Sequence, residues 1–202
     1  MPNRSDHNTP NAGCKRNFSA WRRGTPWFHL YQLLPVSAGT YALWFWLTAP
    51  LTLSVGRLGQ VGLEPGLVVY VGSARGPGGL RARVGRHLRA DGRLHWHIDA
   101  LTAQVPATAV WYTQGAQRLE CRWAAQLLTV PEATLPVTGF GASDCSCPAH
   151  LLTLPVRALS AAWHVLDRPA VLTLWALPES EGADPAADTY ERSAGAGSRT
   201  AR

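Results

Sequence analysis

Lysine is almost missing from this sequence of 202 residues, in which 18 of the 19 basic residues are arginine and Lys15 is the only lysine. Cysteine is scarce as well, and four cysteines are too few for a disulfide-stabilised scaffold of this length. Long apolar runs are also lacking, since the uncharged stretch 24–56 contains no strictly apolar run longer than 41–47. A membrane-spanning helix needs about 20 apolar residues. These shortages exclude a disulfide scaffold and argue against a membrane protein.

The two ends of the chain differ in composition from its centre. The first 26 residues are polar and lack the apolar segment of a secretory signal, so we expect a cytoplasmic protein. Residues 1–26 show no periodicity and are predicted to be a disordered basic arm. Residues 178–202 hold five carboxylates among small residues and are predicted to be a disordered acidic tail. One folded domain, residues 27–177, lies between them.

The chain carries a net charge of +6, and most of its cations are arginine, which binds phosphate as a fixed fork. Six arginines fall within 19 residues, directly after a glycine-rich loop: Arg75, Arg81, Arg83, Arg86, Arg89 and Arg93. Such a run is typical of nucleic-acid backbone binding, in which Arg75, Arg81, Arg86 and Arg89 would contact phosphates. A solvated helix face would have the same composition. Arg83 differs from the others because it borders the apolar stripe of the predicted helix.

The pattern of apolar residues predicts an α/β fold with a small, mixed, mainly antiparallel central sheet flanked by helices. Strands are predicted over five segments: 39–47, 51–55, 66–72, 109–113 and 170–177. Helical spacing predicts one helix over 80–88 and a second over 117–128, which Pro131 ends.

Three residues of these elements could carry chemistry. Glu120 borders the apolar stripe of the second helix, and a buried carboxylate needs either an arginine or a divalent cation as its partner. Tyr41 and Tyr70 stand inside the two central strands. A phenol with an ordinary pKa near 10 is a poor base, so each tyrosine taken alone is interpreted as a core residue.

Two short clusters offer further ligands or bases. His95, His97 and Asp99 are two positions apart, which suits metal ligation or general-base work, although structural histidines are the favoured interpretation. Cys145, Cys147 and His150 could bind zinc together with Cys121 or Asp144. The spacing of these cysteines is not the usual two-residue knuckle, so zinc is the less favoured interpretation and buried thiols the favoured one.

Taken together, these positions resemble the GIY-YIG nuclease superfamily. The resemblance rests on four segments: Gly39-Thr-Tyr41, Tyr70-Val-Gly-Ser-Ala74, Arg83-Val-Gly-Arg-His87, and Glu120 in a helix ahead of Pro131. Over residues 38–177 the chain is similar to an uncharacterised branch, known as a domain of unknown function, found alone or fused to endonuclease III-type DNA glycosylases. Five further stretches carry this second resemblance: 55–59, 70–80, 86–88, 95–99 and 139–151.

The resemblance implies metal-dependent cleavage of phosphodiester bonds. Tyr41 and Tyr70 would both lie beside the scissile phosphate. One of the two, with Tyr70 favoured, would help to deprotonate the attacking water. Arg83 would stabilise charge on the phosphoryl oxygens. Glu120 would hold one Mg²⁺ or Mn²⁺. His87 belongs to the Arg83 motif, and His95 or His97 would take the histidine role that some members have.

The chain departs from the superfamily pattern at several points. Tyr41 and Tyr70 are 29 positions apart, more than is typical, which predicts an extended hairpin or an extra strand between them. Arg83 falls later than is usual, and the loop 75–79 accounts for the difference. The asparagine that many members carry after the metal-binding glutamate has no clear counterpart.

The sequence therefore predicts an endonuclease that cleaves nucleic acid, with DNA as the favoured substrate. It is expected to lie in the cytoplasm, associated with the nucleoid, and to act in DNA repair. A nucleic-acid-binding module without chemistry, accessory to a DNA-repair glycosylase partner, is the alternative. A third interpretation is a zinc-stabilised interaction protein built on Cys145, Cys147 and His150.

Overall fold

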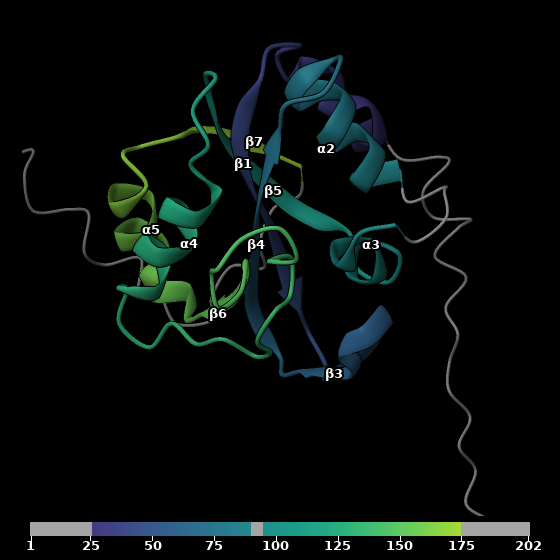
Figure 1. The fold of residues 1–202 in the computed structure, drawn as a ribbon, viewed down its shortest axis with the longest axis vertical. Coiled ribbons are helices and arrows are strands. Elements are labelled where there is room, and N and C mark those ends of the chain that lie inside the picture. The colour runs from purple at the N-terminus through teal and green to yellow at the C-terminus, as the bar shows by residue number, and fades with distance from the viewer. Residues whose placement is uncertain (1–25, 90–94, 175–202) are drawn as a thin grey trace, which may run out of the picture.

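An antiparallel sheet of five strands lies between two layers of helices in the computed structural model, which describes residues 26–89 and 95–174 (Figure 1). The strands are, in spatial order, β6 (Leu151–Leu154), β4 (Gly66–Ala74), β1 (Gly39–Leu47), β5 (Ala107–Gln114) and β7 (Ala170–Thr173). Every neighbouring pair runs antiparallel. The predicted class, a mainly antiparallel sheet flanked by helices, is confirmed.

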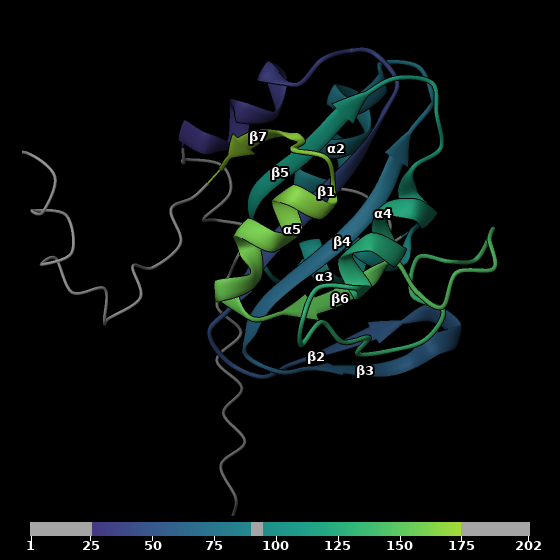
Figure 2. The same ribbon diagram turned by 90° about the vertical axis from the view of Figure 1, so that its left-hand side faces the viewer.

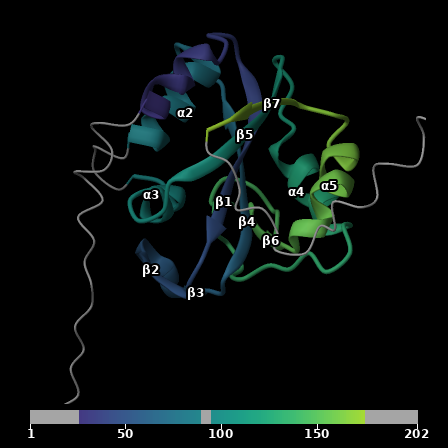
Figure 3. The same cartoon turned by 180° about the vertical axis from the view of Figure 1, so that it is seen from behind.

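Each face of the sheet is covered by its own set of elements. One face carries η1 (Pro26–Leu33), α2 (Gly79–Arg89), α3 (His97–Thr102) and a two-stranded hairpin. The other face carries α4 (Glu120–Leu128) and α5 (Leu159–Val165). Figure 1 shows α2 and α3 on the right of the sheet and α4 and α5 on its left, and Figure 3 shows the same layers from behind.

Strand β1 is apolar at almost every position because both of its faces are buried. Tyr41, Leu43 and Phe45 point into the core shared with α2 and α3. Ala42 and Trp44 point into the core shared with α4 and α5. This alternation places the Tyr41 side chain on the α2 side of the sheet.

The hairpin is formed by β2 (Leu51–Val55) and β3 (Gly59–Leu63), which η2 (Gly56–Leu58) joins. It lies between β1 and β4 in the sequence, packs beside α3 and closes one end of the sheet (Figure 2). The extended hairpin predicted between the two tyrosine strands is therefore confirmed.

Several boundaries differ from the predicted ones. The predicted helix 117–128 begins at Glu120. Strand β7 covers only the first four residues of the predicted strand 170–177, of which 175–177 lie outside the described residues. Apart from the short 3₁₀ helices, α3, β6 and α5 were not predicted, and β3 was expected only as part of the hairpin insertion. The predicted basic arm over 1–26 and acidic tail over 178–202 lie outside the described residues, apart from Pro26. Within the described part of the chain, the structure has no helix of the length and apolar character that a bilayer crossing requires.

Candidate functional site

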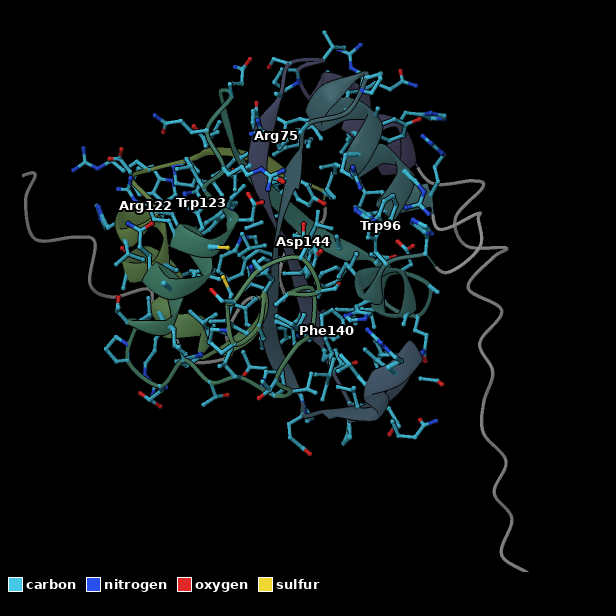
Figure 4. The ribbon with its side chains drawn as sticks, viewed as in Figure 1. Arg75, Trp96, Arg122, Trp123, Phe140 and Asp144 are labelled. Carbon is cyan, nitrogen blue, oxygen red and sulfur yellow. The ribbon has the colours of Figure 1, made fainter. Side chains whose placement is uncertain are left out.

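A pocket of about 390 Å³ opens where β1 and β4 meet α2, α3, the start of α4 and the loop 139–150. It is lined by all seven residues that the sequence singled out as catalytic or as ligands of Mg²⁺: Tyr41, Tyr70, Arg83, His87, His95, His97 and Glu120. Figure 4 shows Asp144 in the middle of this region, with Trp96 on one side and Trp123 of α4 on the other.

A chain of three side chains runs from the pocket into the protein. The Tyr41 hydroxyl lies 3.0 Å from His87 Nε2, and His87 Nδ1 lies 2.9 Å from Asp99 Oδ1. The other oxygen of Asp99 accepts the backbone N–H groups of His95 and Trp96. These bonds place Asp99 at the start of α3 and fix the orientation of the His87 ring.

The protonation of this chain follows from burial and hydrogen bonding. Burial lowers the pKa of His87, although the hydrogen bond to Asp99 acts in the opposite direction. Burial would raise the pKa of Asp99, but the bonds from His87, Trp96 and His95 outweigh it and lower this pKa to about 2. A neutral His87 therefore donates its Nδ1–H to the Asp99 carboxylate and accepts a hydrogen bond from the Tyr41 hydroxyl at Nε2.

Neither tyrosine is ionised by its surroundings alone. Burial raises the pKa of Tyr41 well above its ordinary value, and Tyr70 adds to this while the Arg83 charge opposes it. Burial likewise raises the pKa of Tyr70, again opposed by Arg83. Deprotonation of either phenol therefore needs a neighbouring proton acceptor.

The close packing of Tyr41 depends on Gly72, its partner across β1 and β4. A Cβ atom built on Gly72 would lie 2.6 Å from the Tyr41 hydroxyl oxygen. The missing side chain of Gly72 therefore leaves room for the tyrosine ring beneath the pocket.

Glu120 lies half-buried in the first turn of α4. Its Oε1 accepts a hydrogen bond from Ser73 Oγ at 3.2 Å, whereas its buried Oε2 has no hydrogen-bond partner among residues 26–89 and 95–174. No arginine of the same residues forms an ion pair with Glu120. The sequence offered an arginine or a divalent cation as the partner of Glu120, and no arginine of the described residues takes that place. The carboxylate and hydroxyl oxygens around this position suit a cation that prefers oxygen ligands.

Each of the four arginines that were predicted to bind phosphate donates a side-chain hydrogen bond to another residue of the protein. Arg75 donates to the Ala116 carbonyl and Arg81 to the Leu34 carbonyl. Arg89 donates to the Tyr31 hydroxyl.

Two arginines of α2 place their guanidinium groups against the Trp96 side chain. The Arg83 guanidinium lies 4.4 Å and that of Arg86 3.7 Å from the centre of a Trp96 ring. Arg86 also binds Asp99 at 3.4 Å, with a third of its side chain exposed. Arg83 is half-buried and lines the pocket, which leaves it the best placed of these cations to meet an anion there.

The model of one protein family, Domain of unknown function DUF123, matches residues 40–167. The chain belongs to this family. A comparison with curated proteins found no match, and a comparison with solved structures found none either. The matched part of this DUF123 domain contains every pocket residue named above.

The DUF123 domain also has a group of four residues that could hold a metal ion: Cys121, Cys145, Cys147 and His150. Their ligand atoms all lie within 4.8 Å of one another. Burial raises the pKa of the Cys121 and Cys147 thiols, and Cys145 raises it further in both. Of the two residues that could have completed the motif, the structure selects Cys121, whereas Asp144 is exposed at the pocket.

The two histidines at the start of α3 have separate surroundings. His97 Nδ1 accepts the Gly141 N–H at 3.0 Å, and burial lowers the pKa of this ring. His95 exposes its ring at the pocket, while its backbone N–H binds Asp99. The structure therefore ties His97 to the loop 139–150 and leaves His95 the freer of the two.

Sequence reasoning missed three contributors to the pocket of this DUF123 domain. It named Asp99 only as a companion of His95 and His97, and not as the partner of His87. It gave no role to Ser73, which donates a hydrogen bond to Glu120, or to Trp96, which contacts both Arg83 and Arg86. The i, i+3 spacing of Trp96 and Asp99 is the one available signal, because an acidic residue at that position often accepts the first free amides of a helix.

Proposed function

We propose that this DUF123 domain is a metal-dependent endonuclease related to the GIY-YIG nucleases, which hydrolyses phosphodiester bonds in nucleic acid. The observation that carries the proposal is the half-buried Glu120, whose Oε2 has no partner among the described residues, in one pocket with Arg83 and the Tyr41–His87–Asp99 chain. A carboxylate, a cation and a hydrogen-bonded base are the groups that hydrolysis of a charged ester requires.

Glu120 is the residue that would hold one Mg²⁺ or Mn²⁺ ion. Glu120 lines the pocket, and its buried Oε2 has no hydrogen-bond partner among the described residues, so a cation that prefers oxygen ligands would satisfy this carboxylate. When bound, such an ion supplies positive charge that offsets the charge developing on the oxygens of the reacting phosphate.

Tyr41 is the better candidate for the general base, in place of Tyr70, which the sequence favoured. The neutral His87 can accept the Tyr41 proton at Nε2 while the phenol oxygen takes a proton from the attacking water. Asp99 then stabilises the resulting imidazolium through Nδ1. Among residues 26–89 and 95–174, the Tyr70 hydroxyl has no hydrogen-bonded imidazole of this kind, and the Tyr70 ring packs against Phe140.

The remaining step is the displacement at phosphorus. The water oxygen forms the new P–O bond as the bond to the leaving sugar oxygen breaks, and solvent returns a proton to that oxygen. Arg83 lines the same pocket and would bind the phosphoryl oxygens through its guanidinium. Because Arg83 also lies against Trp96, its position is fixed before the substrate arrives.

The basic character of the domain supports nucleic acid as the substrate, and we place it in DNA repair because the branch it resembles occurs fused to DNA glycosylases. A cytoplasmic, nucleoid-associated location and a glycosylase partner belong to the same proposal. The non-catalytic binding module remains the outcome that a negative cleavage assay would establish.

A cleavage assay tests the proposal. The full chain is incubated with labelled single-stranded, duplex and branched DNA and with RNA, at graded Mg²⁺ and Mn²⁺ concentrations. We expect metal-dependent cleavage that Glu120→Gln abolishes and that Glu64→Gln, an exposed carboxylate outside the pocket, leaves unchanged. Equal cleavage by Glu120→Gln and the wild type would contradict the proposal.

A further inference from the structure

Three sulfur atoms and one imidazole nitrogen meet beside the proposed nuclease pocket, whose lining includes His150. Cys121 belongs to the first turn of α4, Cys145 and Cys147 to the loop 139–150, and His150 immediately precedes β6. His150 Nε2 lies 3.7 Å from Cys121 Sγ and 3.5 Å from Cys145 Sγ. Residues from two parts of the chain, more than 20 positions apart, thus direct their donor atoms at one point.

The two distances from His150 Nε2 to cysteine sulfurs, 3.7 Å and 3.5 Å, are close to those of a tetrahedral zinc site. With Zn–S bonds of about 2.3 Å and Zn–N bonds of about 2.0 Å, a tetrahedron separates a sulfur from a nitrogen ligand by about 3.5 Å. Three thiols and an imidazole are soft or borderline donors, which favour zinc over the oxygen-seeking Mg²⁺, Mn²⁺ or Ca²⁺. The cluster therefore favours zinc, whereas Glu120 is proposed to hold Mg²⁺ or Mn²⁺.

The histidine ligand is held in place by the surrounding backbone. His150 is 3 % exposed, its N–H donates to the Phe140 carbonyl, and its carbonyl accepts the Val71 N–H of β4. The Gly141 backbone forms a hydrogen bond with its ring. Outer hydrogen bonds of this kind fix the tautomer and the orientation of metal-binding histidines.

Phe140 and Ala149 are buried in the core, but the middle of the loop, residues 141–148, has few other means of keeping its shape. Between Phe140 and Ala149 no residue is buried and no helix or strand forms. Two backbone hydrogen bonds close the loop, from Gly139 N to the Pro148 carbonyl and from His150 N to the Phe140 carbonyl. A segment without an apolar core can be ordered by a metal in place of hydrophobic contacts.

We propose that Cys121, Cys145, Cys147 and His150 together bind one zinc ion, which fastens the loop 139–150 to α4. All four tetrahedral positions are taken by protein ligands, so the zinc is structural and leaves no position for a reacting water. The loop supplies Gly141, Ser143 and Asp144 to the pocket wall, and Cys121 adjoins Glu120. The zinc assignment is independent of the nuclease proposal, and only the role of the loop as a pocket wall rests on it.

Metal analysis of the full chain, purified without chelators and desalted after incubation with excess zinc, tests the assignment. We expect about one zinc per chain, a loss of at least about tenfold in Cys145→Ser and Cys147→Ser, and no loss in Cys14→Ser. Cys14→Ser is the matched control because Cys14 is the one cysteine of the sequence that the proposed site does not use. A wild type with less than about a fifth of an equivalent, or an equal loss in Cys14→Ser, would overturn the proposal.

A spectroscopic measurement on the wild-type protein keeps the proposal testable if the serine variants do not fold. Replacement of the zinc by Co²⁺ should give an intense thiolate-to-cobalt charge-transfer band and the visible bands of tetrahedral cobalt. Weak bands of octahedral cobalt without charge transfer would refute the site.

Hydrogen exchange tests the role of the ion. Zinc removal should speed exchange at the Gly139 and His150 amides about tenfold or more and leave the amides of β1 unchanged. Unchanged loop amides would show that the ion does not fasten the loop. Zinc content and exchange are measured without nucleic acid, so a bound zinc without cleavage would refute only the nuclease proposal.

Discussion

Tyr41 and Tyr70 lie on neighbouring strands and line the same pocket, yet only Tyr41 has a hydrogen-bonded histidine behind it. Burial makes phenolate costly at both positions, so the difference between them lies in where a proton can go. The His87 ring supplies that destination for Tyr41, and the Asp99 carboxylate stabilises the charge that the ring then carries.

This difference predicts unequal effects of removing each hydroxyl. Tyr41→Phe should lower the cleavage rate by about 100-fold or more, because it removes the general base, whereas Tyr70→Phe should lower it by less than about tenfold. Single-turnover cleavage at saturating protein measures both rates. Tyr112→Phe, which removes the hydroxyl of the tyrosine paired with Tyr41 on β5, is the control and should be unaffected. A greater loss in Tyr70→Phe would assign the base to Tyr70.

The hydrogen-bonded pair of His87 and Asp99 predicts how the free energy of unfolding depends on pH. Folding lowers the pKa of Asp99 to about 2 and lowers that of His87, so the folded protein binds fewer protons than the unfolded chain below about pH 6.5. The free energy of unfolding should therefore fall as the pH drops below about 6.5, and fall again between about pH 4 and pH 2. The charged groups that face the pair are the guanidinium groups of Arg83 and Arg86.

Urea unfolding at a series of pH values measures this dependence. Asp99→Asn removes the lower carboxylate transition, so its curve should be flatter than that of the wild type between about pH 4 and pH 2. Parallel curves for the two proteins in this interval would contradict the lowered pKa of Asp99 in the folded protein.

At the scale of elements, the contact between β1 and β4 decides whether the tyrosine ring fits. Gly72→Ala would place a methyl group 2.6 Å from the Tyr41 hydroxyl oxygen, so the ring or the strand must shift. We expect a loss of about 1–3 kcal/mol in unfolding free energy and a loss of cleavage. The matched control is Gly62→Ala on β3, where an added Cβ meets no atom within 4 Å, and it should stay within about 0.5 kcal/mol of the wild type. Equal stability of the two variants in urea would contradict this packing.

The long, uniformly apolar or helical segments were predictable from the sequence because burial dictated their composition. Strand β1 matches its predicted bounds, since nine consecutive residues are buried or nearly so. The missed elements lack such a signal. Helix α3 has only six residues, and β3 contains two glycines among its five. Propensity and periodicity are weak over such lengths, where tertiary contacts decide the conformation.

At the scale of the molecule, the site was predictable only where a resemblance or a local spacing pointed to it. The seven pocket residues came from such signals, and the structure brings them together. The pairing of His87 with Asp99 was not predictable in this way, and the sequence left the fourth ligand beside Cys145, Cys147 and His150 open between Cys121 and Asp144. Both contacts join segments that the sheet and helices bring into contact, and nothing in the composition of one segment names its partner in the other.

The most direct test of the account separates binding from hydrolysis in a single pair of variants. Nucleic-acid affinity and single-turnover cleavage are measured for the wild type, Glu120→Gln and Glu64→Gln, with Mg²⁺ present and at two salt concentrations. The account predicts that Glu120→Gln binds as tightly as the wild type, with the same salt sensitivity, and cleaves at least about 100-fold more slowly. Salt-sensitive binding without metal-dependent cleavage by the wild type would contradict the account and make the domain a binding module.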